Sequence, residues 1–481
     1  MPAPIFFRPS DGWVGDVIPF VRDDRVNLFF LNDRRDPSKP GTSWNLYTTE
    51  DFASYAYHEV SLAHGTTAEQ DLNAYTGSIV ESDGVTHLFY TGLNPEFLAP
   101  STGEPAQVVM HATSTDGLRT WTKHPDHTFG APDGYDASDW RDPFVFKPEP
   151  DGPWHMLLAA RSVSGPSRRR GLIADCVSYD LVSWKVVDPF WAPRRYITHE
   201  CPEVFSMGDW WYLVYSEFSD HFVTRYRLSR SPFGPWTVPL RDSIDGRAFY
   251  AAKSAEHRGA RYFAGWIPTR EGEVDDGAWQ WAGDLAVHEA VPASDGTLDF
   301  RMPTGLRASF DQRFVPEFRP VLGDWSATDS AWQLSVADGY GVTVAADAPD
   351  QFLLELTIDI GADTTECGVI LRASADGDEG YIVRLEPRAG RMVFDRWPRK
   401  HTGDGQWQIS GDISHEVERP IEIKPGRHRL SVLADGTACV AYLDDKVAMS
   451  TRMYDRHGGG IGLFVGEGDA TFTDVCFATR Q

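Results

Sequence analysis

The sequence lacks the features of a disulfide-bonded secreted domain, of a zinc protein and of a membrane protein. It has five cysteines, an odd total, and their wide spacing gives neither a disulfide framework nor a zinc-binding pattern. No stretch reaches the roughly 18 apolar residues of a membrane span, and residues 1–8 are not a basic segment followed by an apolar one. We therefore expect a cytoplasmic protein, or a secreted one whose signal peptide has been removed, that needs no cofactor and no metal ion.

Basic residues are also scarce. The chain has 45 Lys and Arg residues against 70 Asp and Glu residues, and its formal net charge is −25. Nucleic acids and anionic membrane surfaces are bound through basic patches, so this charge argues against both as partners. The charge is compatible with a neutral ligand such as a sugar. Nothing in the sequence indicates the oligomeric state.

Long helical periodicities are missing as well, and their absence points to an all-β protein. Aromatic residues make up 13% of the chain, which also contains 43 Gly and 32 Pro. This composition is typical of short strands joined by tight turns. At 481 residues the chain is too long for one ordinary domain, so we expect two.

One pattern recurs in the first part of the chain: a polar residue, a short apolar run, a tight turn and an aromatic strand. Its clearest copy is Ile197–Phe218, in which a Met-Gly-Asp turn precedes the strand Trp210–Tyr215. A period of about 50 to 70 residues made of short strands is typical of a β-propeller blade. Residues 1–305 are therefore predicted to form a five-bladed β-propeller. The turns of the five copies lie near Asp24, Gly84, Gly152, Gly208 and Gly259.

The pattern ends after the fifth copy. Residues 306–322 are bounded by prolines and irregular, and we expect them to be a linker. Beyond them, segments such as Phe352–Ile360 and His428–Leu433 alternate apolar and polar residues. Alternating strands at short intervals predict an antiparallel β-sandwich over residues 323–481.

The polar residues that begin the five copies are candidates for catalysis. The first strand of every propeller blade lines the central channel, so residues at the same place in each repeat are expected to converge. Hydrolysis of a glycosidic bond requires two carboxyl groups across the scissile bond, one ionised and one protonated, and a third acid can bind sugar hydroxyls. The five residues are Asp16, Ser78, Asp142, Glu200 and Lys253, and the three acids are the predicted catalytic residues.

Other residues near these positions are candidates for binding the sugar. Arg141 precedes Asp142 and could anchor or neutralise it, and His199 precedes Glu200 and could orient it. Three tryptophans close to the motifs could stack on sugar rings. The predicted substrate-binding residues are Trp13, Trp44, Ser78, Arg141, His199, Lys253 and Trp281.

Four short segments carry a family resemblance. Arg141-Asp142-Pro143 and Glu200-Cys201-Pro202 resemble the two central motifs of glycoside hydrolase family 32, the invertase and fructanase family. Tyr75–Ser78 is similar to its second-blade motif, and Phe249–Ser254 with the Phe-Ala-Gly-Trp segment after it is similar to its fifth-blade segment. The resemblance spans the predicted propeller, and a trailing β-sandwich fits the family's second domain.

The resemblance implies roles for the three acids: Asp16 as nucleophile, Glu200 as general acid/base and Asp142 as transition-state stabiliser. The chain departs from the family at the first motif. The family usually has Trp-Met-Asn-Asp-Pro-Asn-Gly, whereas this chain has Trp-Val-Gly-Asp-Val-Ile-Pro, so both Asn positions are lost, to Gly15 and Ile18.

These observations predict a retaining, exo-acting glycoside hydrolase that cleaves terminal furanosyl residues. The expected activity is that of a β-fructofuranosidase on sucrose- or fructan-type saccharides. Two alternatives remain open from the residues. One is an inverting hydrolase of the arabinofuranosidase or xylosidase type on the same propeller, and the other is a non-catalytic carbohydrate-binding propeller.

Overall fold

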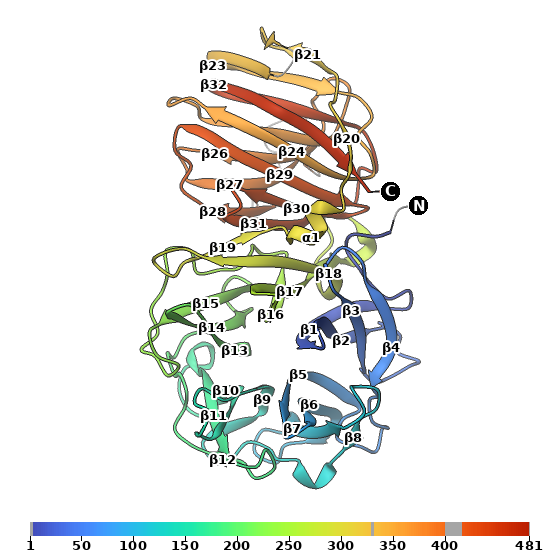
Figure 1. The fold of residues 1–481 in the computed structure, drawn as a ribbon, viewed down its shortest axis with the longest axis vertical. Coiled ribbons are helices and arrows are strands. Elements are labelled where there is room, and N and C mark those ends of the chain that lie inside the picture. Colours follow the sequence, from blue (N-terminus) through green and yellow to red (C-terminus); the bar gives the residue numbers. More distant parts are fainter. Residues whose placement is uncertain (1–2, 329–330, 400–415, 481) are drawn as a thin grey trace.

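The computed structural model describes residues 3–328, 331–399 and 416–480, and within them the chain folds into two β domains. The N-terminal domain is a ring of blades, and the C-terminal domain is a stack of long strands that rests on one side of this ring (Figure 1). The prediction of an all-β propeller followed by a β-sandwich is confirmed. None of the helices in the described residues has the length and apolar character needed to cross a membrane.

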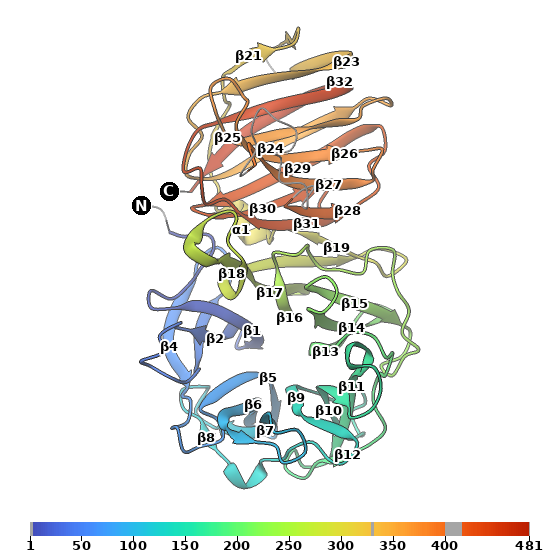
Figure 2. The same ribbon diagram turned by 180° about the vertical axis from the view of Figure 1, so that it is seen from behind.

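The described residues of the N-terminal domain form five antiparallel blades, as Figure 2 shows from behind. In each blade the strands follow one another in chain order from the channel outwards. The first blade contains β1 (Trp13–Arg22), β2 (Arg25–Asp33), β3 (Trp44–Thr49) and β4 (Ala56–Leu62). The second contains β5 (Asn73–Ser82), β6 (Val85–Leu98), β7 (Pro105–Ser114), β8 (Thr122–Lys123) and the 3-10 turn η1 (Pro125–His127).

The remaining three blades follow the same plan. The third contains β9 (Tyr135–Phe146), β10 (Trp154–Ser162), η2 (Ser167–Arg169), β11 (Gly171–Ser178) and β12 (Lys185–Val186). The fourth contains β13 (Glu200–Met207), β14 (Trp210–Glu217) and β15 (Val223–Ser229). The fifth contains β16 (Tyr250–His257), β17 (Ala260–Arg270), η3 (Glu271–Glu273), β18 (Trp279–Pro292) and β19 (Leu298–Arg301).

Tight turns join the first two strands of the blades. In three blades both central residues of the turn have positive φ: Asp23 and Asp24 (52° and 56°), Asp83 and Gly84 (53° and 76°), and Arg258 and Gly259 (51° and 76°). Two-residue turns of this kind match the right-handed twist of the flanking strands, and Asp and Gly tolerate the conformation best. The charged turns of the sequence pattern therefore set the hairpin register.

The ring closes between its first and last blades. Strand β18 pairs with β1 through Val14 and Gly283, and Phe7 forms a further bridge to Leu285. Neighbouring blades also share apolar cores. One such core joins Trp44 of the first blade to Tyr90 of the second. Radial closure leaves the outer strand of each blade as its outward-facing edge and gives the inner strands fixed positions around one axis.

Every inner strand is interrupted by an irregularity of register near its start. The shifts fall between Val14 and Val17 in β1, Tyr75 and Gly77 in β5, Arg141 and Phe144 in β9, Glu200 and Glu203 in β13, and Tyr250 and Lys253 in β16. A bulge of this kind bends the strand and changes the direction of its side chains.

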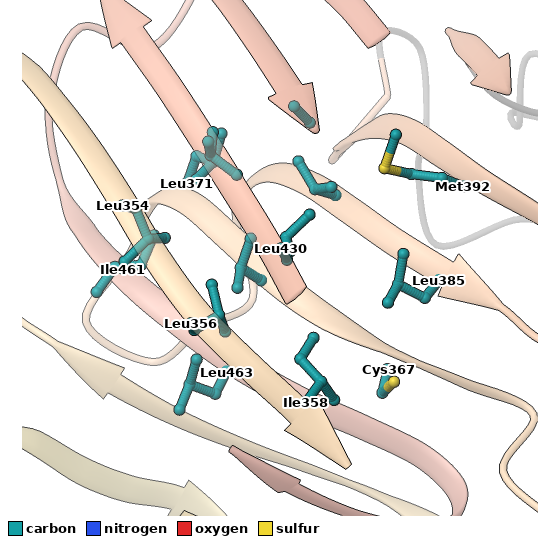
Figure 3. Close-up of a cluster of buried hydrophobic side chains, with 14 of the residues drawn as sticks. Leu354, Leu356, Ile358, Cys367, Leu371, Leu385, Met392, Leu430, Ile461 and Leu463 are labelled. Carbon is teal, nitrogen blue, oxygen red and sulfur yellow. The ribbon is translucent and has the colours of Figure 1, made fainter. Parts of the chain in front are cut away.

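The C-terminal domain is one large antiparallel sheet that folds over itself. Its central strand, β32, pairs with β20, β23, β24 and β25, and the inward side chains of strands from both ends of the sheet occur in one apolar cluster (Figure 3). After α1 (Thr304–Ala308), its described strands are β20 (Gln312–Phe314), β21 (Phe318–Leu322), β22 (Ser326–Ala327), β23 (Ala331–Ala345), β24 (Gln351–Ile360), β25 (Glu366–Ala373), β26 (Gly380–Glu386), β27 (Arg391–Trp397), β28 (Val417–Pro420), β29 (Gly426–Asp435), β30 (Ala438–Leu443), β31 (Val447–Arg452) and β32 (Gly460–Thr479).

The expected linker, residues 306–322, is not irregular throughout. It contains the end of α1 and the strands β20 and β21, which pair with β32 and β23. Pro320 lies within β21, which pairs on one side only, and such an edge position tolerates a residue without an N–H group. One of the prolines that suggested a linker, Pro320, therefore belongs to an edge strand of the second domain.

Buried polar groups join the two domains. Oδ2 of Asp245 in the propeller accepts a hydrogen bond from the Ser450 hydroxyl at 2.7 Å and lies 3.0 Å from His288 Nε2, and its Oδ1 accepts from the Ser450 amide at 3.0 Å. The Arg419 guanidinium donates to the Asp245 carbonyl at 2.6 Å. Burial raises the pKa of Asp245, but its bond to His288 and the charge of Arg419 outweigh burial and lower the pKa to about 2.

We predict that Asp245→Ala strongly destabilises the protein, because it leaves buried donors of both domains without their acceptor. Removal of one partner of a buried charged pair costs about 3–5 kcal/mol. The measurement is the free energy of unfolding in urea, with Asp209→Ala as a control, since the Asp209 side chain is 94% exposed. Because the folded pKa lies below the usual value of 3.8, the stabilisation is present above pH 3.8 and is lost as the pH falls towards 2. Equal stability of the two variants at pH 7 would contradict the prediction.

Candidate active site

A pocket of about 470 Å³ lies where the inner strands of the propeller begin. Three of its lining side chains are the predicted catalytic acids Asp16, Asp142 and Glu200, which come from three different blades. The lining consists of Asp16, Leu31, Tyr75, Thr76, Gln107, Ser138, Asp139, Arg141, Asp142, Glu200, Phe218 and Trp281.

Asp16 is held by donors from two other blades. The Thr76 hydroxyl donates to Asp16 Oδ2 at 2.5 Å, and the Trp266 indole N–H donates to Oδ1 at 3.1 Å. Burial raises the pKa of the Asp16 carboxyl and the charge of Glu200 adds to this, while the two hydrogen bonds and Lys253 act in the opposite direction. The two donors fix both oxygens and favour the ionised form.

Glu200 is also bound at both oxygens. The Arg141 guanidinium donates to Oε1 at 3.1 Å, and the Tyr250 hydroxyl donates to Oε2 at 2.5 Å. Burial raises the pKa of Glu200 and the neighbouring charge of Asp142 adds to this, against the effect of Arg141. A carboxyl group with a raised pKa keeps its proton to higher pH, as a general acid must.

Asp142 lies in a bulge with positive φ, 57°. Its Oδ2 accepts a hydrogen bond of 2.9 Å from the Cys201 amide, and its own amide donates to the Thr91 hydroxyl at 2.8 Å. The Arg141 guanidinium approaches the same carboxylate at 3.8 Å. Burial raises the pKa of Asp142, with a contribution from the charge of Asp16.

The expectation that these acids occupy the same place in each repeat is wrong. Arg141, Glu200 and Tyr250 are the equivalent residues, each being the last paired residue before its bulge. Asp142 is the first unpaired residue of its bulge, and Asp16 directly precedes Val17, the first paired residue after its own. The carboxylates therefore converge because the bulges redirect successive side chains into the same space, and not because they share one repeat position.

Of the predicted binding residues, the structure places Arg141 and Trp281 in the pocket lining. Trp281 belongs to β18 and its side chain is 39% exposed, which leaves a ring face available to a sugar. Trp13 does not line the pocket, because its ring packs against the guanidinium groups of Arg8 and Arg35, at 4.1 and 5.0 Å.

Four of the predicted binding residues are buried outside the pocket lining, and we correct their assignment. Trp44 is fully buried and donates to the carbonyls of residues 74 and 75, so it cannot stack on a ligand. The Ser78 hydroxyl accepts from the Val145 amide at 2.9 Å, between two blades. His199 is buried among Trp191, Tyr196 and Tyr215, and burial lowers its pKa to about 3.

Lys253 is the fourth of these residues. It is 3% exposed, and its ammonium group donates to the Gly77 carbonyl at 2.8 Å. The bond joins β16 to β5, which are not neighbours in the ring. Lys253 therefore crosses the channel interior and acts on the site through its charge, which lowers the pKa of both Asp16 and Asp142.

The sequence reasoning missed several residues that contact the acids or line the pocket. Thr76, Tyr250 and Trp266 lie inside the segments that carried the family resemblance. The sequence therefore indicated that these segments matter, but not that these three side chains contact the acids. Asp139 and Gln107 had no such signal. The missed residues are Leu31, Tyr75, Thr76, Gln107, Ser138, Asp139, Phe218, Tyr250 and Trp266.

The departure at the first motif has a structural counterpart. A Cβ atom at Gly15 would lie 2.5 Å from the Trp281 ring, so the indole occupies the space that an Asn side chain needs. Trp281 is held there through its carbonyl, which accepts from Arg35 at 2.6 Å. Ile18, at the other lost Asn position, is 2% exposed and packs in the core between the first two blades.

Across residues 3–328, 331–399 and 416–480, no group of three or more His, Cys, Asp or Glu side chains is arranged to hold an ion. The site can supply an ionised carboxylate, a carboxyl group with a raised pKa, and donors for sugar hydroxyls. These are the groups that acid–base and nucleophilic chemistry at a glycosidic bond requires.

Comparison with known families matches both domains. Residues 6–298 match the glycosyl hydrolases family 32 N-terminal domain, and residues 328–478 match the C-terminal domain of the same family.

Individual relatives agree with the family matches. A raffinose invertase of Escherichia coli is 24% identical, with 98% of this chain and 94% of the relative covered. A solved sucrose-6-phosphate hydrolase of Lactobacillus gasseri has a TM-score of 0.73 at 17% identity, covering 99% of this chain and 93% of that one. An exo-inulinase of Aspergillus awamori has a TM-score of 0.72 at 18% identity, covering 100% and 99%.

We predict that Lys253→Met moves the acid limb of the pH–rate profile to higher pH. Lys253 lowers the pKa of Asp16, so its loss raises that pKa and the ionised carboxylate disappears at a higher pH than before. The position of the limb is measured from kcat/KM between pH 4 and 9. Lys253→Arg keeps the charge and should leave the limb in place. An unchanged limb, or one moved to lower pH, in the Met variant would contradict the role of this charge.

We predict that Gly15→Asn lowers kcat/KM about 10- to 100-fold, because overpacking forces the Trp281 ring out of position. The effect should depend on the indole. The loss in the Gly15→Asn/Trp281→Ala double variant should therefore be smaller than the sum of the two single losses, with a coupling energy of about 1 kcal/mol or more. Gly458→Asn is the matched control, since this exposed glycine has open space around a side chain and no positive φ. Additive losses would show that the two positions act independently.

Proposed function

Because the chain belongs to glycoside hydrolase family 32, we propose that it is a retaining, exo-acting β-fructofuranosidase, which releases a terminal fructofuranosyl unit from a saccharide. It is a glycoside hydrolase acting on O-glycosyl bonds. Relatives are named for action on raffinose, sucrose 6-phosphate, levan and fructan. The observation that carries the proposal is the convergence of Asp16, Asp142 and Glu200 in one pocket lined by an exposed Trp281.

In the proposed mechanism Asp16 is the nucleophile. One of its oxygens bonds to the anomeric carbon while the glycosidic C–O bond breaks, and Glu200 transfers its proton to the leaving oxygen. Glu200, now ionised, takes a proton from water, which adds to the anomeric carbon and releases Asp16. The two steps consume one water and return both carboxyl groups to their initial states.

The contacts of each acid support these roles. Asp16 accepts two neutral hydrogen bonds, which hold its oxygens in a fixed direction without neutralising the nucleophile. Tyr250 and Arg141 donate hydrogen bonds to Glu200. Both can stay bonded to it when it is ionised after the first step and when it is protonated again after the second. Because Asp16, Asp142 and Glu200 are close, the pH dependence belongs to the coupled site and not to single residues.

The third acid and the aromatic residue complete the site. Asp142 is held by the Cys201 amide through one oxygen and is placed to accept sugar hydroxyls with the other. Preorganised acceptors of this kind stabilise the positive charge that develops on the sugar ring in the transition state. The exposed face of Trp281 can stack on the apolar face of a sugar ring.

We predict that Glu200→Ala and Asp16→Ala differ in their response to the leaving group and to azide. Loss of the general acid costs about 10²- to 10⁴-fold with a natural saccharide, but much less with a nitrophenyl furanoside, which leaves without protonation. The second step then lacks its base, so added azide should restore turnover of Glu200→Ala. Asp16→Ala should respond to neither change, because it cannot form the covalent intermediate.

The control is Glu203→Gln, a buried carboxylate in the same strand whose oxygens accept from Ser254 at 2.6 and 2.8 Å. It should show no azide response. Azide rescue of Asp16→Ala, with product of inverted configuration, would exchange the two roles and favour an inverting hydrolase. Full activity of both Ala variants on every furanoside would reject the site.

A further inference from the structure

The charge of the pocket is strongly one-sided. Four carboxylates line it, the three proposed catalytic acids and Asp139, whereas Arg141 is the one cation among its described lining residues. The Arg141 guanidinium is already shared, since one nitrogen donates to Glu200 at 3.1 Å and another pairs with Asp139. Even with Glu200 protonated, the lining carries more negative than positive charge.

Asp139 owes its position to a second interruption of β9. The pairing with β10 runs from Trp140 directly to Tyr135, so residues 136–139 form an excursion that brings Ser138 and Asp139 into the lining. The second oxygen of Asp139 pairs with the Arg161 guanidinium at 2.8 Å. The carboxylate is thus fixed between two arginines and its side chain is 13% exposed.

Asp139 lies on the side of the pocket that receives the leaving group. Glu200 delivers its proton to the leaving oxygen in the proposed mechanism, and Arg141 binds Glu200 and Asp139 at the same time. Gln107, which accepts from Arg141 at 3.1 Å, lines the same side. The departing sugar therefore faces a carboxylate, Asp139, and uncharged polar groups such as Gln107.

Two neighbouring arginines are engaged in other ion pairs. Arg161 and Arg170 pair with Asp136, and Arg161 also pairs with Asp139. Arg247 forms no ion pair within the described part of the chain and its buried Nη1 has no hydrogen-bond partner there, but its guanidinium packs 4.1 Å from the Phe222 ring and lies outside the pocket lining. Recognition of a phosphate ordinarily uses arginine or lysine side chains that are free to face it.

We propose that the leaving-group side of the pocket selects uncharged saccharides and rejects sugars that carry a phosphate, with Asp139 as the discriminating residue. The inference rests on the proposed function and narrows its substrate class. A phosphomonoester carries about −1.5 to −2 charges at pH 7. Like charges brought together at a recognition site cost several kcal/mol, which corresponds to a preference on the order of 100-fold. Several relatives of the chain are named sucrose-6-phosphate hydrolases, so the distinction separates it from them.

The test compares kcat/KM for sucrose and sucrose 6-phosphate at pH 7 and low ionic strength. We expect sucrose to be preferred by about 100-fold, and the preference to shrink as salt is added, because salt screens the repulsion. Equal rates, or a preference for the phosphorylated sugar, would overturn the inference while the proposed function stands.

Two matched variants test the role of Asp139. Asp139→Asn should reduce the preference for sucrose about tenfold, because it removes one carboxylate and frees the charges of Arg141 and Arg161. Asp136→Asn removes a carboxylate of the same arginine network that does not line the pocket, and should leave the preference unchanged. A similar change in both variants, or in neither, would reject the assignment of Asp139.

Binding to Glu200→Gln, measured by calorimetry with the same two sugars, keeps the two hypotheses apart. Tighter binding of sucrose without turnover by the wild type would contradict the proposed function alone. Tighter binding of sucrose 6-phosphate would contradict the inference alone. Binding of neither sugar, with no turnover, would reject both.

Discussion

The pocket depends on the bulges that interrupt the inner strands of the propeller. In a regular strand, successive side chains point to opposite faces, so two neighbouring residues cannot both face the channel. The bulges remove this limit at the same level in each blade, and Arg141 and Asp142 can therefore contact the same group of carboxylates. The backbone strain involved is visible in the positive φ of Asp142, Cys201 and Ala251, 57°, 49° and 52°. The bond from the Cys201 amide to Asp142 links two of the bulges and stabilises both.

Burial of several carboxylates in one pocket opposes folding, because desolvation and mutual repulsion both disfavour their charged forms. The rest of the molecule compensates for this cost. Arg141 and Lys253 bring positive charge to the group from the third and fifth blades, and hydroxyl and indole donors come from the second and fifth blades. The sandwich fixes the last blade through Asp245 and His288, so the ring that holds these donors cannot open easily. The same contacts therefore position the catalytic groups and stabilise the propeller.

Much of this arrangement could be predicted from the sequence. The repeated hairpin gave the number of blades because its turns and aromatic strands are local features, which depend on neighbouring residues only. The three acids could be found because they begin these hairpins.

The orientation of side chains within a bulge is not a local feature, and this explains the errors. Ser78 and Lys253 start the same pattern as the acids, yet one accepts a backbone bond between blades and the other spans the channel. Trp44 was a candidate because it lies close to the motifs in the sequence, although a neighbouring blade covers it. Asp139 could not be predicted as a pocket residue, because the excursion of β9 that places it there has no counterpart in the described inner strands of the other repeats.

The bond between Lys253 and Gly77 has a consequence for the order of events during turnover. It crosses the channel just beyond the bulges, where both residues form the first strand pairs of their blades after the register shift. A saccharide chain cannot thread through a ring that is closed in this way, and both products must depart through the mouth by which the substrate entered. For an enzyme that works through a covalent intermediate, the leaving saccharide then stands between the intermediate and the solvent. It must depart before water arrives, and a second saccharide that takes its place can accept the bound sugar instead. In the proposed mechanism, the bond across the channel thus makes the residence time of the first product the quantity that decides between hydrolysis and transfer.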